Sequence, residues 1–466
     1  MAIILLSVQP CFSKNKVKVA CIGASITYGA RITDREHNSY PAQLQQLLGN
    51  QYTVINYGVS GSTMLKKGNQ PYWNTTQYQQ ALTDRPDIVI IDLGGNDAKL
   101  VNRIYMNEFE QDCREMVRSF RQLPSHPRVL LLLAMPSFVK DTSGIYDPVI
   151  IKQVNPHIQN VAYTDAVEVI DMHAPFADKE ALMQDKIHPD ATGAAIMAKE
   201  VFDVIGAGAD NDFNVFTQLP PHTTNSFYGY VCASFKLDGH NCNVVQPKFA
   251  AKGHPWVWRA RFWGHEPQAD ISLLQRGYHI VYCDVAELFG NNVAIAAWNK
   301  FYALLYKAGL AKKTILEGMS RGGVYALNWA AENPRKVAGV YIDNPVLDLK
   351  SWPGGVGNAV KSPKEQQQFM DDYQLKTTDD IKAFKGSPID KIPAIVKGKY
   401  PMLILCADAD EALPPSENTL PFEQQVKALG GNITVIHKPG FKHHPHSFPN
   451  PALITQFIVN AFNQHK

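Results

Sequence analysis

Two serines in this chain stand where a short apolar run gives way to a stretch of helical period. Ser25 follows the run 17–22, and Ser320 follows the run 313–317, within the Gly-x-Ser-x-Gly pentapeptide 318–322. A side chain at the carboxyl end of a parallel strand lies where open α/β sheets bind their ligands. A tight strand–turn–helix connection, with glycines beside the serine, leaves the hydroxyl exposed. The two positions therefore predict two parallel sheets, each with a serine at its carboxyl edge.

Apolar runs of strand length recur along both halves of the chain, separated by stretches of helical period. The runs expected to form strands are 17–22, 52–57, 87–93, 128–134 and 167–171 in the first half, and 227–233, 243–248, 256–262, 278–284, 313–317, 338–342, 402–406 and 433–437 in the second. Alternation of strands with helices favours parallel sheets that helices cover on both faces. We therefore expect an α/β protein.

The length of 466 residues suits two domains. Turn-forming residues are concentrated in 207–224, which we interpret as a linker between a first domain over 14–206 and a second over 225–466. Proline, glycine, lysine and glutamine interrupt the alternation over 345–398, and we expect this stretch to be an insertion or lid above the second serine. Residues 1–13 resemble the end of a signal peptide, which predicts export to the periplasm or the medium.

The composition is that of an ordinary globular protein, with 45% hydrophobic and 19% charged residues and a formal net charge of +2. A charge balance this close to neutral gives no reason to expect a nucleic-acid or anionic membrane partner. No apolar run reaches the roughly 18–20 residues that span a bilayer. The seven cysteines form no Cys-x-x-Cys pair or His/Cys cluster, so we expect no metal and no cofactor.

Three blocks downstream of Ser25 supply the groups that a weak serine nucleophile needs. Gly61 follows the second apolar run and can offer a backbone N–H to an oxyanion, and Asn96 follows the third run and carries an amide donor. Asp185 stands three residues before His188, so its carboxylate can hold the imidazole in one tautomer while the other nitrogen faces the serine. The set predicts acyl transfer through a serine.

Residues 17–205 resemble the SGNH hydrolases, a family named for its serine, glycine, asparagine and histidine, because all four blocks occur in order. The resemblance implies a three-layer α/β/α, flavodoxin-like domain. Ala24 departs from the family, in which many members carry Asp before the serine, but that residue is not part of the chemical apparatus. The implied roles of nucleophile, base, orienting acid and oxyanion donors fall on Ser25, His188, Asp185, Gly61 and Asn96, with the N–H of Ser25 as a further donor.

The partners of Ser320 are expected in the chain order serine, acid, histidine, which is the order of the α/β-hydrolases. Asp410 follows the apolar run 402–406 and is the preferred acid, and Asp343 is a second position for it. His443 has the best spacing for the base, with His444 as the alternative.

Residues 225–466 resemble the α/β-hydrolase superfamily throughout. The elbow Gly-x-Ser-Arg-x-Gly is similar to that of glucuronoyl esterases, in which the arginine points at the oxyanion and the ester; that role falls here on Arg321. A second oxyanion N–H is implied in the loop after the strand 256–262, at Trp263 or Phe262. The elbow together with 351–355 and 443–447 resembles the α/β-hydrolase pectin methylesterases of gut Bacteroidetes.

These resemblances imply a secreted carbohydrate esterase with two serine sites that act on a plant-type oligosaccharide or polysaccharide. The first domain is expected to remove acetyl groups, and the second to hydrolyse a uronic-acid ester such as the methyl ester of galacturonate. Both reactions would pass through an acyl-enzyme without metal or cofactor. Two alternatives stay open: both domains are O-acetylesterases acting on xylan, pectin or sialic acid, or one domain is a non-catalytic sugar-binding module.

Overall fold

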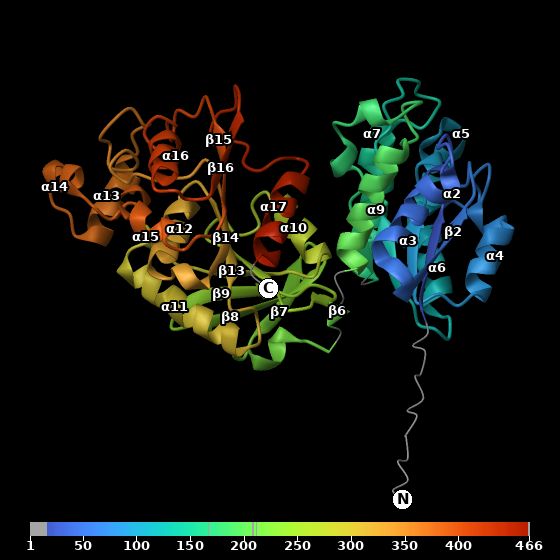
Figure 1. Cartoon of the computed structure of the whole chain (residues 1–466), viewed down its shortest axis with the longest axis horizontal. Coiled ribbons are helices and arrows are strands. Elements are labelled where there is room, and N and C mark those ends of the chain that lie inside the picture. The colour runs from blue at the N-terminus through green and yellow to red at the C-terminus, as the bar shows by residue number, and fades with distance from the viewer. Residues whose placement is uncertain (1–15, 166, 207–208, 211, 465–466) are drawn as a thin grey trace, which may run out of the picture. The chain divides into compact units, whose positions relative to one another are not determined.

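The computed structural model describes residues 16–165, 167–206, 209–210 and 212–464, and the chain divides into two compact units, Met1–Phe202 and Asp203–Lys466 (Figure 1). Each unit is built on its own sheet, which confirms the expected α/β class. The stretch 1–13, expected to be a signal-peptide remnant, lies outside the described residues. Among the described helices, none is long and apolar enough to cross a membrane.

The first unit contains a five-stranded parallel sheet in the order β2-β1-β3-β4-β5. Its strands are β1 Val17–Gly23, β2 Tyr52–Gly58, β3 Ile88–Asp92, β4 Arg128–Leu132 and β5 Glu168–Ile170. The central strand β3 is buried along its whole length. A parallel strand that helices cover on both faces reads as a continuous apolar run, and this explains why Ile88 to Ile91 shows no alternation.

Helices cover both faces of this sheet. The α-helices are α1 Ser25–Tyr28, α2 Arg35–Asn38, α3 Tyr40–Leu48, α4 Thr76–Thr83, α5 Leu100–Arg103, α6 Phe109–Arg121, α7 Asp147–Val149, α8 Asn155–Thr164 and α9 Ala191–Ile205. Apolar side chains of α4, α6 and α8 pack on one face, against a row that includes Ile22 and Val89. Cys21 belongs to the opposite face and contacts Tyr40 of α3, and Gln43 of α3 donates to the carbonyl of Ala191 at the start of α9.

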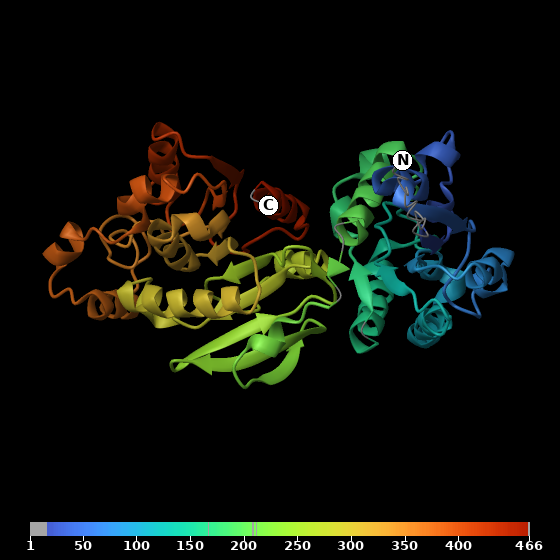
Figure 2. The same cartoon turned by 60° about the horizontal axis from the view of Figure 1, so that its bottom comes forward.

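The second unit contains a nine-stranded sheet in the order β16-β15-β14-β13-β11-β12-β9-β8-β7. Its strands are β7 Thr223–Phe227, β8 Tyr230–Leu237, β9 His240–Val245, β11 Trp256–Arg259, β12 His279–Cys283, β13 Thr314–Met319, β14 Val337–Asp343, β15 Met402–Ala407 and β16 Ile433–Lys438. The strands β7 to β9, seen in light green in Figure 2, run antiparallel to one another, and β9 is also antiparallel to β12. The six strands from β16 to β12 in this order are parallel to one another.

Two layers of helices enclose this sheet. The α-helices are α10 Gln268–Gln275, α11 Asn292–Lys307, α12 Gly322–Glu332, α13 Pro363–Tyr373, α14 Thr378–Ala383, α15 Ile392–Val396, α16 Thr419–Ala428 and α17 Ala452–Asn463. Helices α11, α12 and α16 pack on one face, where the fully buried Trp258 stacks on Trp298 with ring centroids 4.2 Å apart. Helices α10 and α17 pack on the other face.

The stretches predicted to be a linker and an insertion both contain regular secondary structure. Within 207–224, β6 Ala209–Asp210 pairs antiparallel with β10 Ala250–Ala251, and a short 3-10 helix spans Val215–Gln218. The stretch 345–398 lies between β14 and β15 and contains helices α13, α14 and α15.

Candidate active sites

Ser25 is the first residue of α1, directly after β1, so it lies at the carboxyl edge of the first sheet. Gly23, the last residue of β1, is closely packed. A Cβ atom at that position would lie 2.0 Å from Oγ1 of Thr27 and 2.9 Å from the carbonyl oxygen of Asp92. Only glycine allows so close an approach of the turn to its neighbours. The apolar strand and the glycine together place the serine hydroxyl at the edge of the sheet.

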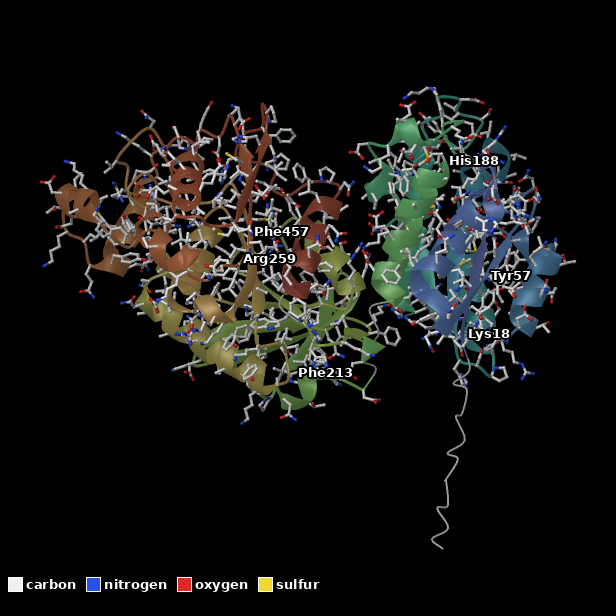
Figure 3. All side chains as sticks on the ribbon, in the orientation of Figure 1. Lys18, Tyr57, His188, Phe213, Arg259 and Phe457 are labelled. Atoms are coloured by element: carbon white, nitrogen blue, oxygen red, sulfur yellow. The ribbon has the colours of Figure 1, made fainter. Side chains whose placement is uncertain are left out.

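His188, labelled in Figure 3, and Asp185 come from the loop before α9. Nε2 of His188 lies 2.7 Å from Oγ of Ser25, and Nδ1 lies 2.7 Å from Oδ2 of Asp185. Burial favours the neutral form of Asp185, but hydrogen bonds from His188 and Ile187 outweigh it and lower the pKa of this carboxyl. The tautomer with its hydrogen on Nδ1 donates to the carboxylate and leaves Nε2 free to accept the serine proton.

The two predicted oxyanion donors of the first unit are placed differently. Asn96 is buried, lines the same pocket as Ser25 and donates one N–H of its side chain to the carbonyl of Ser62 at 3.0 Å. This bond fixes the amide and leaves its second N–H for another acceptor. Gly61 adopts a φ of +85°, which favours glycine, but it is not among the described residues that line the pocket.

The pocket beside Ser25 is small, with a cavity volume of about 30 Å³. That space holds roughly two groups of the size of water. Its walls are largely apolar and include Met135, Pro136, Ile145 and Ile187. A narrow space of this kind beside the nucleophile suits a small acyl group.

Ser320 occupies the turn between β13 and α12 with a φ of +50°. A Cβ atom at Gly318 would lie 2.6 Å from the backbone of Gly322, and one at Gly323 would lie 2.6 Å from Cβ of Pro345. Both glycines are therefore required by close contacts, as a strained nucleophile turn demands.

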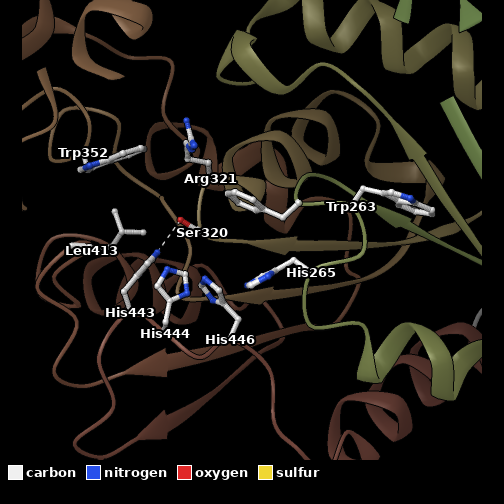
Figure 4. Close-up of a pocket in the computed structure, with 11 residues that line it drawn as sticks. Trp263, His265, Ser320, Arg321, Trp352, Leu413, His443, His444 and His446 are labelled. Carbon is white, nitrogen blue, oxygen red and sulfur yellow. Dashed lines mark hydrogen bonds between the residues drawn. The ribbon is translucent and has the colours of Figure 1, made fainter. Parts of the chain in front are cut away.

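The structure brings Ser320, His443 and Asp410 together. Nε2 of His443 lies 3.0 Å from Oγ of Ser320 (dashed in Figure 4), and Nδ1 lies 2.7 Å from Oδ2 of Asp410. The Asp410 carboxylate is almost fully buried, and its other oxygen accepts the N–H of Leu413 at 2.8 Å. The arrangement is that of a serine, a base and an acid that orients the base.

The two alternative partners of Ser320 occupy other places. Asp343, at the end of β14, is fully buried and accepts hydrogen bonds from Nζ of Lys438 and from the N–H of Ser447. The ring of His444 stands 4.9 Å from that of His443 and nearly perpendicular to it, and no hydrogen bond joins it to Ser320 among the described residues. Burial and the neighbouring imidazoles lower the pKa of His444.

Arg321, the predicted cation beside the nucleophile, lies on the pocket wall but is already paired. Its Nη1 donates to Oε2 of Glu365 at 2.5 Å, and its guanidinium lies 5.6 Å from the ring of Trp352. Burial, with a smaller effect from Arg261, lowers the pKa of Arg321. Trp352 lines the pocket and Glu365 of α13 pairs with Arg321, so the stretch 345–398 contributes to this site.

Trp263, the predicted oxyanion position, lies in the loop after β11. Its indole points away from Ser320 and packs on the rings of Phe227 and Tyr282, with centroids 4.7 Å and 5.5 Å apart (Figure 4). The side chain is therefore a structural contact. Any catalytic contribution of this residue would come from its backbone N–H.

Arg259 holds the loop that carries Trp263, and the sequence did not single it out. It is fully buried, at the position labelled in Figure 3. Its guanidinium donates to the carbonyls of Phe262 and His265 and to the carboxylates of Asp270 and Glu317. Burial and the adjacent Asp270 raise the pKa of Glu317 well above its usual range. Its position as a charged residue inside the apolar run 256–262 is the sequence feature that could have indicated a buried ionic network.

The pocket beside Ser320 has a cavity volume of about 570 Å³, within the usual range for small-molecule sites. Aromatic and imidazole side chains dominate its lining, which consists of Phe262, Trp263, His265, Ser320, Arg321, Trp352, Ala412, Leu413, His443, His444 and His446. It is far larger than the pocket of Ser25, so the two sites admit groups of different size.

Comparison with known proteins gives matches to parts of the chain. Residues 21–196 match the GDSL-like Lipase/Acylhydrolase family. A protein named acetylxylan esterase from Xylanibacter ruminicola is 39% identical over 208 residues, which cover 41% of this chain and 43% of that protein. This chain thus spans less than half the length of that relative.

Two solved structures illustrate the distant likenesses. A carbohydrate acetylesterase from Sinorhizobium meliloti is 19% identical, with 41% of this chain and 99% of that chain covered and a TM-score of 0.34. An S-formylglutathione hydrolase from Agrobacterium tumefaciens is 15% identical, with 52% and 97% covered and a TM-score of 0.38. The family match over residues 21–196 and the fold of the first sheet agree, and the first unit is a GDSL-like acylhydrolase domain.

Proposed function

We propose that this chain is a carbohydrate esterase with two serine active sites, one in each unit. The observation that carries the proposal is the presence of two assembled triads. His188 lies 2.7 Å from the Ser25 hydroxyl, and His443 lies 3.0 Å from the Ser320 hydroxyl. In each case a carboxylate lies 2.7 Å from the second ring nitrogen.

In both sites the histidine takes the hydroxyl proton as the serine oxygen attacks the ester carbonyl. The negative charge that develops on the carbonyl oxygen requires hydrogen-bond donors, a role proposed for Asn96 in the first unit. The protonated imidazole then gives its proton to the departing alcohol, which leaves an acyl-serine. Water attacks the acyl-serine with the same histidine as base, and the free acid and the serine hydroxyl are restored.

For the first unit we propose deacetylation of a polysaccharide or its oligosaccharides. The match to the GDSL-like Lipase/Acylhydrolase family and the similarity to a protein named acetylxylan esterase support this assignment. The small cavity beside Ser25 also supports it, because an acetyl group is among the smallest acyl groups. We also propose that the enzyme acts in the periplasm or the medium, where it would meet a polysaccharide.

For the second unit we propose hydrolysis of a uronic-acid ester, with a pectin-type methyl ester as the first substrate to test. In such an ester the sugar itself carries the acyl carbon, so the pocket must admit a whole sugar ring. The cavity of about 570 Å³ and the aromatic ring of Trp352 in its wall meet that requirement. Arg321 would supply positive charge near the ester.

Separate substitution of the two serines tests the proposal. Wild type, Ser25→Ala, Ser320→Ala and the double variant are given acetylated xylan and acetylated, methyl-esterified pectin, and the release of acetate and methanol is measured. We expect Ser25→Ala to lose acetate release and Ser320→Ala to lose methanol release. Acetate release that depends on both serines would instead indicate two O-acetylesterases. Full retention of every activity in either single variant would assign that unit to substrate binding.

A further inference from the structure

Two loops of the second unit bring four imidazole groups together on one wall of the Ser320 pocket (Figure 4). His443, His444 and His446 follow β16, and their rings stand 4.9 to 5.0 Å apart. His265 comes from the loop after β11, and its ring centroid lies 6.3 Å from those of His444 and His446. Glu266 follows it, with a carboxylate oxygen 3.5 Å from Nε2 of His265.

Two of these groups have a buried polar atom without a partner. Nε2 of His446 and Oε2 of Glu266 make no hydrogen bond to the described residues. His446 is only 3% exposed and lines the pocket. Its other nitrogen, Nδ1, faces Oδ1 of Asp343 at 3.4 Å. A buried ring nitrogen without a partner, on an imidazole whose other nitrogen faces a carboxylate, is the arrangement that metal-binding histidines show.

We propose that His265, Glu266 and His444 bind a divalent transition-metal ion of the zinc class, with His446 as a fourth ligand. One candidate ligand atom from each of His265, Glu266 and His444 lies within 4.8 Å of the others. His444 also belongs to a second set that meets this limit, with His443 and His446. Tetrahedral zinc with bonds of roughly 2.0–2.1 Å brings its ligand atoms to about 3.3 Å from one another. His265 and His444 are exposed, so their side chains can turn to close the difference.

His443 is not part of the proposed set, although its ring is a neighbour. Both of its nitrogens are engaged, one with Ser320 and the other with Asp410. A ligand set of imidazoles and one carboxylate suits zinc, nickel or copper better than calcium or magnesium. The ion would face the cavity that Ser320 lines, with any free coordination position open to a substrate oxygen. The site does not depend on which ester Ser320 cleaves.

Titration of the metal-free full chain with zinc chloride tests the inference, with binding followed by calorimetry. We expect wild type to bind one zinc ion at this pocket. We expect the affinity for that ion to be at least about tenfold lower in His444→Ala and in His265→Ala. Cobalt(II) in place of zinc is expected to give the visible absorption of a tetrahedral complex in wild type and to lose it in both variants.

Two further variants locate the ion. His437→Ala removes a ligand from another candidate group of the same unit, Cys406, Asp408 and His437, and is expected to bind zinc as wild type does. His443→Ala is also expected to retain the ion. No zinc binding in wild type, binding unaffected by both His444→Ala and His265→Ala, or loss of the ion in either of the two further variants would overturn the proposal. Circular dichroism and the melting temperature check that each variant is folded.

Discussion

The guanidinium of Arg321 donates a hydrogen bond of 2.5 Å to the carboxylate of Glu365, from the stretch between β14 and β15. The cation beside the nucleophile therefore has a counter-charge from a part of the chain that lies 44 residues further on. Arg321 is also close to the rings of Phe262, Phe289 and Trp352. The pair fixes where the positive charge lies in the pocket.

A double-mutant cycle measures what this pair does for catalysis. Arg321→Met is expected to lower kcat/KM at the Ser320 site by about 10²–10³, the usual loss for one oxyanion donor. If Glu365 acts by positioning Arg321, Glu365→Gln lowers kcat/KM by a smaller factor in wild type and by none in the Arg321→Met background. Losses that simply add would show that Glu365 does not act through Arg321.

Two neighbouring carboxylates provide a matched test of the Ser320 triad. Asp410 lies 2.7 Å from Nδ1 of His443, whereas Asp408 lies 2.6 Å from Nδ1 of the exposed His437. Asp410→Asn is expected to lower kcat by up to about 10⁴ with little change in KM, because the imidazole loses its orienting acid. Asp408→Asn should change kcat less than about twofold. A comparable loss in both variants would mean that the effect is not specific to the triad.

The buried Arg259 predicts a large effect on stability. Arg259→Met leaves the carboxylates of Asp270 and Glu317 and two loop carbonyls without their donor. Removal of one partner from a buried ionic group costs about 3–5 kcal/mol, and we expect the free energy of unfolding of the second unit to fall by that amount in urea titrations. Arg335→Met, at an exposed site, is the control. A change below about 1 kcal/mol for Arg259→Met would contradict the role of this network.

Much of the fold could be predicted from the sequence, and the errors have physical causes. The runs 17–22 and 402–406 coincide closely with β1 and β15, because parallel strands buried on both faces are apolar throughout. The run 227–233, expected to be one strand, covers the end of β7 and the start of β8. The hairpin turn falls on Tyr228 and Gly229, both with positive φ, and a Tyr-Gly pair is a weak sequence signal for such a turn.

The candidate sites show where local sequence information ends. Spacing favoured His443 over His444, but the backbone of the loop decides which imidazole reaches Ser320. The expectation of no metal rested on cysteine spacing and on near neighbours in the sequence only. His265 meets His444 because two strand-end loops, far apart along the chain, converge at one edge of the sheet. Pairing of this kind follows from the strand order, which periodicity does not reveal.

Asp92 makes the stability of the first unit depend on pH. It ends β3, is buried, and accepts a hydrogen bond of 2.9 Å from the Thr27 hydroxyl. Burial, only partly offset by that bond, raises the pKa of this carboxyl from 3.8 to about 6. The proton therefore binds more tightly in the folded chain. Protonation of Asp92 therefore stabilises the folded first unit. This contribution is complete below the pKa that the carboxyl has in the unfolded chain, and it is lost as the pH rises through its pKa in the folded chain.

From these two pKa values, we expect the ionisation of Asp92 alone to lower the free energy of unfolding by about 2 kcal/mol as the pH rises from about 4.5 to about 7.5. Calorimetric melting at the two pH values checks this, with the transition of the first unit identified as the one that Arg259→Met leaves in place. Asp92→Asn should reduce the shift of that transition by several degrees, since about 1 kcal/mol corresponds to roughly 2–4 °C in a unit of this size. Asp178→Asn, a carboxylate that is 74% exposed, should leave the shift unchanged. An equal shift in wild type and Asp92→Asn would show that Asp92 ionises normally in the folded unit.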